Sequence, residues 1–137
     1  MGIDFRGARS EQGYWPSWFE WRPLWMLCAV IGDDLIREED LLAIKYCDYL
    51  ILNKKKSLEM GRRLIDFLTL DNKEKIYHDI LTYLVSNRNP MFVENIFTDY
   101  IEGTNDLKIA SSGYRLNDNT VRRFSMFLVK SGGLIHD

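Results

Sequence analysis

A single arginine lies among the tryptophans near the start of the chain. Arg22 is flanked by Trp15, Trp18, Trp21 and Trp25, which are all four tryptophans of the sequence. A guanidinium group stacks on aromatic faces and binds a carboxylate or phosphate through two hydrogen bonds. Surfaces rich in Trp and Arg concentrate binding energy, so we predict that these five residues contact a partner. The alternative is a set of rings packed in the core, where each would bury on the order of 150–250 Å².

A second set of polar residues is suited to holding a small anionic ligand. Its members combine cations with side chains that accept or donate hydrogen bonds, and they are Asp4, Arg22, Asn53, Lys54 and Lys55. The run 54–56, followed by Arg62 and Arg63, would line a surface for phosphate or for an acidic protein at the start of a helix. Two alternatives stay open, which are a buried Asp4–Arg22 ion pair and a solvated turn of lysines.

Residue types that carry catalysis are present without the spacing that catalysis needs. Cys28 and Cys47 lie in apolar helical patterns, which indicates buried thiols, and the two histidines, His78 and His136, are far apart. The acidic run 38–40 suits the first turn of a helix better than a metal. The glycines form no phosphate-binding loop. We therefore predict a protein that is not an enzyme, with no catalytic residues, no metal and no cofactor.

Length and composition indicate one ordinary globular domain over residues 1–137. The hydrophobic fraction is 46% and the charged fraction is 28%. A net charge of −2 argues against direct DNA binding, which requires a basic face, and leaves a neutral or basic protein partner open. The first residues have no apolar signal segment, and no apolar run is long enough for a membrane span. We expect a cytoplasmic protein that does not contact a membrane.

Hydrophobic periodicity predicts a mainly α fold of about six helices, with a short strand pair formed by the two ends of the chain. Arg22-Pro23 opens the first helix, because proline is favoured at the first helical position. Gly61 lies inside the third helix and indicates close packing of another element there. The predicted helices cover residues 22–32, 38–52, 57–70, 72–85, 90–103 and 120–130, with short extended segments at 3–5, 107–109 and 134–137.

Two motifs give the chain a resemblance to a known family. It opens with residues 1–7, Met-Gly-Ile-Asp-Phe-Arg-Gly, followed at 21–25 by Trp-Arg-Pro-Leu-Trp. Residues 119–134 end in Phe-Leu-Val-Lys-Ser-Gly-Gly-Leu. Both segments resemble a family of small uncharacterised bacterial and phage proteins. Asn53 falls where that family has Asn-Asp-Gly, but lysines follow it here, and the cysteine-rich insert of longer members is missing. The resemblance implies a phage or mobile-element setting and no mechanism.

These observations lead to a functional hypothesis and an alternative. The hypothesis is a non-catalytic binding protein that neutralises a macromolecular partner, as an immunity protein does a toxin or an anti-defence inhibitor does a host nuclease complex. The alternative is a protein that binds or sequesters a nucleotide, with Trp faces stacking the base and Arg22 with Lys54 or Lys55 holding phosphate. The amphipathic helix at 72–85 would also serve a homo-oligomer.

Overall fold

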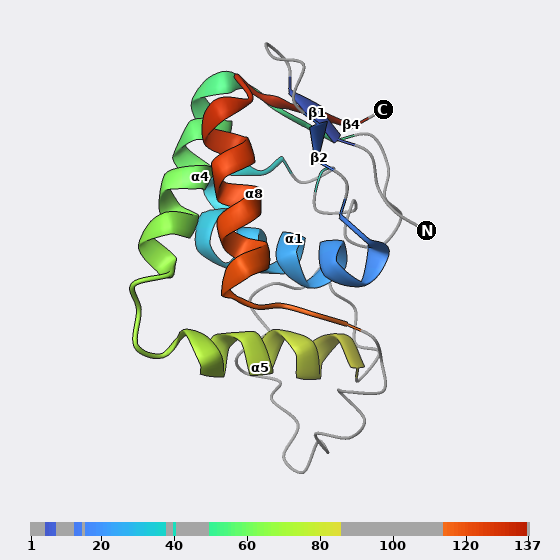
Figure 1. Cartoon of the computed structure of the whole chain (residues 1–137), viewed down its shortest axis with the longest axis vertical. Helices are drawn as coiled ribbons and strands as arrows, with labels where there is room; N and C mark the ends of the chain where they lie inside the picture. Colours follow the sequence, from blue (N-terminus) through green and yellow to red (C-terminus); the bar gives the residue numbers. More distant parts are fainter. Residues whose placement is uncertain are drawn as a thin grey trace.

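The computed structural model describes residues 5–7, 13–14, 16–37, 40, 50–85 and 114–136 (Figure 1). This part of the chain is mainly helical, as predicted. Its helices are α1 (Trp18–Gly32), η1 (Asp33–Leu35, a 3₁₀ turn), α4 (Lys54–Phe67), α5 (Lys73–Val85) and α8 (Asp118–Lys130). Its strands are β1 (Phe5–Gly7), β2 (Gly13–Tyr14), β3 (Leu50–Leu52) and β4 (Leu134–His136). The helix predicted at 90–103 and the strand predicted at 107–109 lie outside the described residues.

Helix α1 begins four residues before the predicted start, because Ser17 caps it. The Ser17 side chain accepts a hydrogen bond from the Glu20 amide at 3.2 Å. Pro23 is therefore inside the helix, which corrects the prediction that it opens it. Proline has no N–H to donate to the carbonyl four residues earlier, that of Phe19. This carbonyl instead accepts a hydrogen bond from the Arg115 amide at 3.1 Å.

The four strands form one antiparallel sheet in the order β2-β1-β4-β3. The predicted pair of N- and C-terminal strands is present, with Arg6 opposite Ile135. The prediction of a helix over 38–52 is wrong at its end, because residues 50–52 form β3. Ile51 of this strand also lies opposite Ile135, on the other side of β4. Pairing with a strand more than eighty residues away thus overrides the local helical pattern.

Helices α4 and α8 lie side by side (Figure 1). The Ser57 hydroxyl of α4 donates to the Leu128 carbonyl of α8 at 2.7 Å, in a buried position. At Gly61, a Cβ atom would lie 2.7 Å from Val129 Cγ2 and 2.9 Å from the Ser125 carbonyl oxygen. The close packing predicted at Gly61 is confirmed, and it sets the distance between the two helices.

Helix α1 supplies the centre of the core. Its consecutive residues Leu24 to Ala29 are all fully buried, because α4, α5 and α8 pack around it. Helix α5 is joined to α8 by a polar link at Asp118, which accepts hydrogen bonds from Lys73 Nζ at 2.7 Å and Tyr77 Oη at 2.8 Å. These two hydrogen bonds lower the pKa of the Asp118 carboxyl, with Lys73 making the larger contribution.

The substitution Gly61→Ala should destabilise the protein. Alanine gains about 1 kcal/mol of helix propensity over glycine, but overpacking against a backbone carbonyl costs about 1–3 kcal/mol. We expect a net loss of about 1 kcal/mol or more in the free energy of unfolding, measured by urea denaturation. The control is Asp66→Ala on the exposed side of α4, which should change stability by less than about 0.5 kcal/mol. Equal stability of the two variants would contradict a tight α4–α8 contact.

Candidate functional site

Two tryptophans of α1, Trp21 and Trp25, belong to the core. Trp21 and Trp25 are fully buried and stack on each other with ring centroids 5.1 Å apart. Phe5 of β1 packs on Trp21 at 4.5 Å. The Trp25 indole N–H donates to the Asp40 carbonyl at 3.0 Å, which satisfies its polar group. Neither ring presents a surface to a partner in this conformation. Trp15 and the side chain of Trp18 lie outside the described residues.

Arg22 is half-buried at the side of this core. Its Nη1 donates a hydrogen bond to the Tyr114 hydroxyl, and its guanidinium carbon lies 5.4 Å from the centroid of the Tyr114 ring. The predicted cation–π contact therefore exists, but with a tyrosine from the segment before α8. Asp4, the alternative partner of Arg22, lies outside the described residues.

The larger cavity of the candidate site lies where η1 meets the start of α4. It has a volume of about 400 Å³. Leu35 and Leu58 provide apolar walls, while cations and other polar groups come from Asn53, Lys55, Lys56, Glu59 and Arg62. Two of the predicted ligand-binding residues, Asn53 and Lys55, are thus brought together. The cavity is lined by both apolar side chains and cations. This is the composition of a site for an anion that also carries apolar atoms.

Asn53 is the N-cap residue of α4. Its side-chain oxygen accepts a hydrogen bond from the Lys56 amide at 2.8 Å and so caps α4. Helix α4 begins at Lys54, three residues before the start predicted at 57, and Ser57 is buried against α8. Capping uses one amide N–H of the first turn of α4.

The charge at the start of α4 is unfavourable for the helix itself. Its first turn holds Lys54, Lys55 and Lys56 and no acidic residue. The N-terminal end of a helix carries a partial positive charge, so each cation there costs rather than gains about 0.3–1 kcal/mol. Lys54 and Lys55 are exposed and Lys56 is half-buried. A negatively charged group bound at this end would relieve the repulsion.

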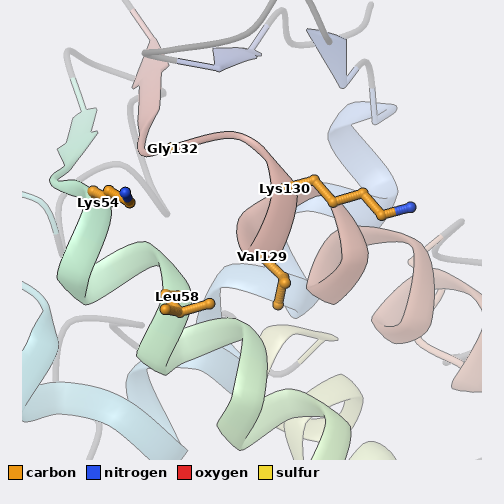
Figure 2. Close-up of a pocket in the computed structure, with 5 residues that line it drawn as sticks. All are labelled: Lys54, Leu58, Val129, Lys130 and Gly132. Atoms are coloured by element: carbon orange, nitrogen blue, oxygen red, sulfur yellow. The ribbon is translucent and has the colours of Figure 1, made fainter.

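A smaller cavity lies on the other side of Leu58, between α4 and α8 (Figure 2). Its volume is about 210 Å³, and Leu58 and Val129 lie on opposite sides of it. Lys54 and Lys130 contribute to its rim, and Gly132 closes the end near the sheet. Gly132 has a φ of 72°, a conformation that favours glycine and allows the chain to turn from α8 into β4.

Arg63 holds the wall of the larger cavity in place. Its guanidinium forms two hydrogen bonds to the Asp34 carboxylate of η1, at 2.6 and 3.0 Å, and one to Glu59 at 3.2 Å. It also donates to the Ile31 carbonyl near the end of α1 at 3.2 Å. The hydrogen bond from Arg63 lowers the pKa of the Asp34 carboxyl. These contacts fix Leu35, the next residue of η1, against α4.

Sequence reasoning missed the apolar half of the site and its contribution from α8. Leu35, Leu58 and Val129 come from three separate elements; in the sequence Leu58 and Val129 are ordinary helix residues and Leu35 lies between two predicted helices. Lys130 joins the lysines of α4 because β3 and β4 pair and draw the two helix ends together. No local signal in the sequence reports this juxtaposition.

In the part of the chain that the structure describes, the other chemistry-bearing residues form no second site. Cys28 is fully buried, and burial raises the pKa of its thiol, which makes it a poor nucleophile. Cys47 lies outside the described residues. Within the described ranges, no three His, Cys, Asp or Glu side chains are placed to hold a metal ion. No helix in that same part of the chain has the length and apolar character to cross a bilayer.

Comparison with known proteins adds no relative to this picture. No protein-family model, no curated protein and no solved structure matches the chain. The resemblance to small bacterial and phage proteins therefore stays a prediction.

The contact with Arg63 should hold the pKa of the Asp34 carboxyl below the ordinary range of an aspartate. We expect the Asp34 carboxyl, followed by carbon-detected NMR, to have a pKa below the unperturbed value of about 3.9. Because the folded-state pKa is lowered, the stabilisation is complete above about pH 4 and is lost as the pH falls through the lowered value. In Arg63→Gln the pKa of Asp34 should return toward its ordinary value. An unchanged pKa in that variant would contradict the contact.

Proposed function

We propose that this chain is a non-catalytic binding protein that neutralises an acidic macromolecular partner. Its contact surface is the basic face, which we define as Lys54, Lys55, Lys56, Arg62 and Lys130. The net charge of the chain is −2, but the local charge of this face is positive. Local charge governs contact with a partner, since charges on distant surfaces are screened beyond about 8–10 Å at physiological salt.

One observation carries the proposal. Lys55, Lys56 and Arg62 line a single cavity that also has apolar walls. Cations placed together at the positive end of a helix lower the stability of the isolated chain. The arrangement becomes favourable when a carboxylate or phosphate group of a partner lies between them.

The proposal changes the set of contact residues. Trp21 and Trp25 are left out, because both are fully buried. Trp15, Trp18 and Arg22 stay candidate contacts on the sequence argument, and the neighbouring Phe19 is 44% exposed. The notion of an inhibitor from a phage or mobile element, acting on a cytoplasmic toxin or nuclease complex, rests on the family resemblance of the terminal motifs.

Charge reversal on the basic face should weaken partner binding. We expect Lys55→Glu to raise the dissociation constant for poly-L-glutamate, used as the acidic probe, about tenfold, which corresponds to about 1.4 kcal/mol. The measurement is biolayer interferometry at several salt concentrations. The control is Arg115→Glu, an equal change of charge at an exposed position before α8. Equal affinity of the two variants would exclude the basic face as the contact surface.

A second candidate function is the binding of a small anionic ligand such as a nucleotide. The volume of about 400 Å³ supports it, because ligand pockets range from about 300 to 1,000 Å³. This function requires micromolar binding of AMP or ATP, measured by isothermal titration calorimetry, with at least a tenfold loss in Arg62→Gln. Retention of affinity in that variant would place the nucleotide elsewhere, and absence of binding would leave the macromolecular partner as the occupant.

A further inference from the structure

The outward face of the α4–α8 pair carries apolar side chains that the fold leaves in contact with solvent. Ile65 is 44% exposed, Met126 is 46% exposed and Val129 is 36% exposed. Leu58 and Ile65 are seven residues apart on α4, and Met126 and Val129 are three apart on α8, so each pair lies on one side of its helix. Val129 Cγ2 lies 2.7 Å from where a Cβ atom of residue 61 would be, which places Val129 beside the line where the two helices meet.

We call Leu58, Ile65, Met126 and Val129 the apolar stripe. Cations lie beside these residues on both helices. Arg62 and Arg122 are exposed and lie on the same sides of α4 and α8 as the apolar residues, by helical spacing. Lys54 and Lys130 contribute to the rim of the smaller cavity at the end nearest the sheet.

Two of the neighbouring carboxylates accept hydrogen bonds within the chain, and Glu59 shares its cation, Arg63, with Asp34. Glu59 accepts a hydrogen bond from Arg63, and Asp118 accepts hydrogen bonds from Lys73 and Tyr77. The exposed Asp66 lies next to Ile65, toward the far end of α4. Along each helix the apolar side chains therefore alternate with an arginine, because Arg62 lies between Leu58 and Ile65 on α4 and Arg122 lies one turn from Met126 on α8.

We infer that the α4–α8 face binds an acidic amphipathic helix of the partner protein, a conclusion that rests on the proposed function and names the partner's chemistry. An amphipathic helix places its apolar residues in a groove and its charged residues at the margins. Here the apolar residues meet Ile65, Met126 and Val129, and the carboxylates meet Arg62 and Arg122.

The smaller cavity provides the anchor point for this helix. Its volume of about 210 Å³ accepts an aliphatic side chain between Leu58 and Val129. In Figure 2, Lys54 stands at the start of α4 while the Lys130 side chain runs along α8 away from it. Carboxylates one turn either side of the anchor residue would meet these two cations, which fixes the register of the bound helix.

Charge argues against a second copy of this chain as the occupant. A two-fold contact places the same surface on both subunits, so Arg62 and Arg122 would face the cations of the other copy. Like charges brought together across an interface cost several kcal/mol. A nucleic acid would match the cations but would leave the apolar stripe uncovered, since Ile65, Met126 and Val129 provide no ring for base stacking.

The test uses two synthetic acidic peptides of equal composition. One forms an amphipathic helix of about five turns, with leucines on one side and glutamates elsewhere; the other has the same residues in scrambled order. Fluorescence anisotropy gives the dissociation constants with the full chain. Methyl NMR signals of Ile65, Met126 and Val129 report the location. The variant is Met126→Ser, and its matched control is Leu70→Ser, which alters a 45%-exposed side chain beyond the end of α4.

We expect the amphipathic peptide to bind at least tenfold more tightly than the scrambled one and to shift the three methyl signals. Met126→Ser should weaken it at least fivefold, and Leu70→Ser should not. Equal binding of both peptides would overturn the inference that the α4–α8 face binds a helix. It would still agree with the proposal that the basic face binds an acidic partner. No binding of either peptide at millimolar concentration would overturn both proposals. Self-association in sedimentation, or tighter binding of a single-stranded oligonucleotide, would assign the face to another occupant and overturn the inference.

Discussion

The contact between α4 and α8 at Gly61 is the constraint on which the candidate site depends. Because Gly61 has no side chain, the α4 backbone approaches the Ser125 carbonyl and Val129 of α8. The chain enters α4 from β3 and leaves α8 into β4, and these strands pair with Leu52 opposite Leu134. A helix pair and a strand pair thus fix the same two connections, which keeps Lys54 and Gly132 at one cavity.

The helix at the centre of the molecule explains why the aromatic segment is ambiguous in sequence. Trp21 and Trp25 are one turn apart and stack on each other, as two rings at that spacing also would on an exposed helix. Their burial depends on Phe5 and Phe124, which come from the two ends of the chain. The density of aromatic residues therefore shows that this side of the helix packs against something. It does not distinguish packing in the core from contact with a partner.

Local signals in the sequence predicted the parts of the fold that local forces determine. The helices that became α5 and α8 and the tight packing at Gly61 all follow from residue type and period. Strand β3 did not, because its pairing with β4 joins distant segments, whereas the early start of α1 follows from a local cap at Ser17 that the prediction missed. The candidate site divides in the same way: its lysines were visible as a run, whereas its apolar walls required the tertiary structure.

The combination of cations and apolar side chains on one face has a consequence for selectivity. Cations alone attract any polyanion and mainly accelerate association. Apolar side chains alone associate with any hydrophobic surface. A face that carries both penalises each incomplete match, because a polyanion leaves Met126 and Val129 in water while a neutral apolar helix desolvates Arg62 and Arg122 without pairing them. Only a ligand that presents carboxylates beside an apolar stripe satisfies both conditions, so the geometry of two helices confers selectivity without a buried polar pocket.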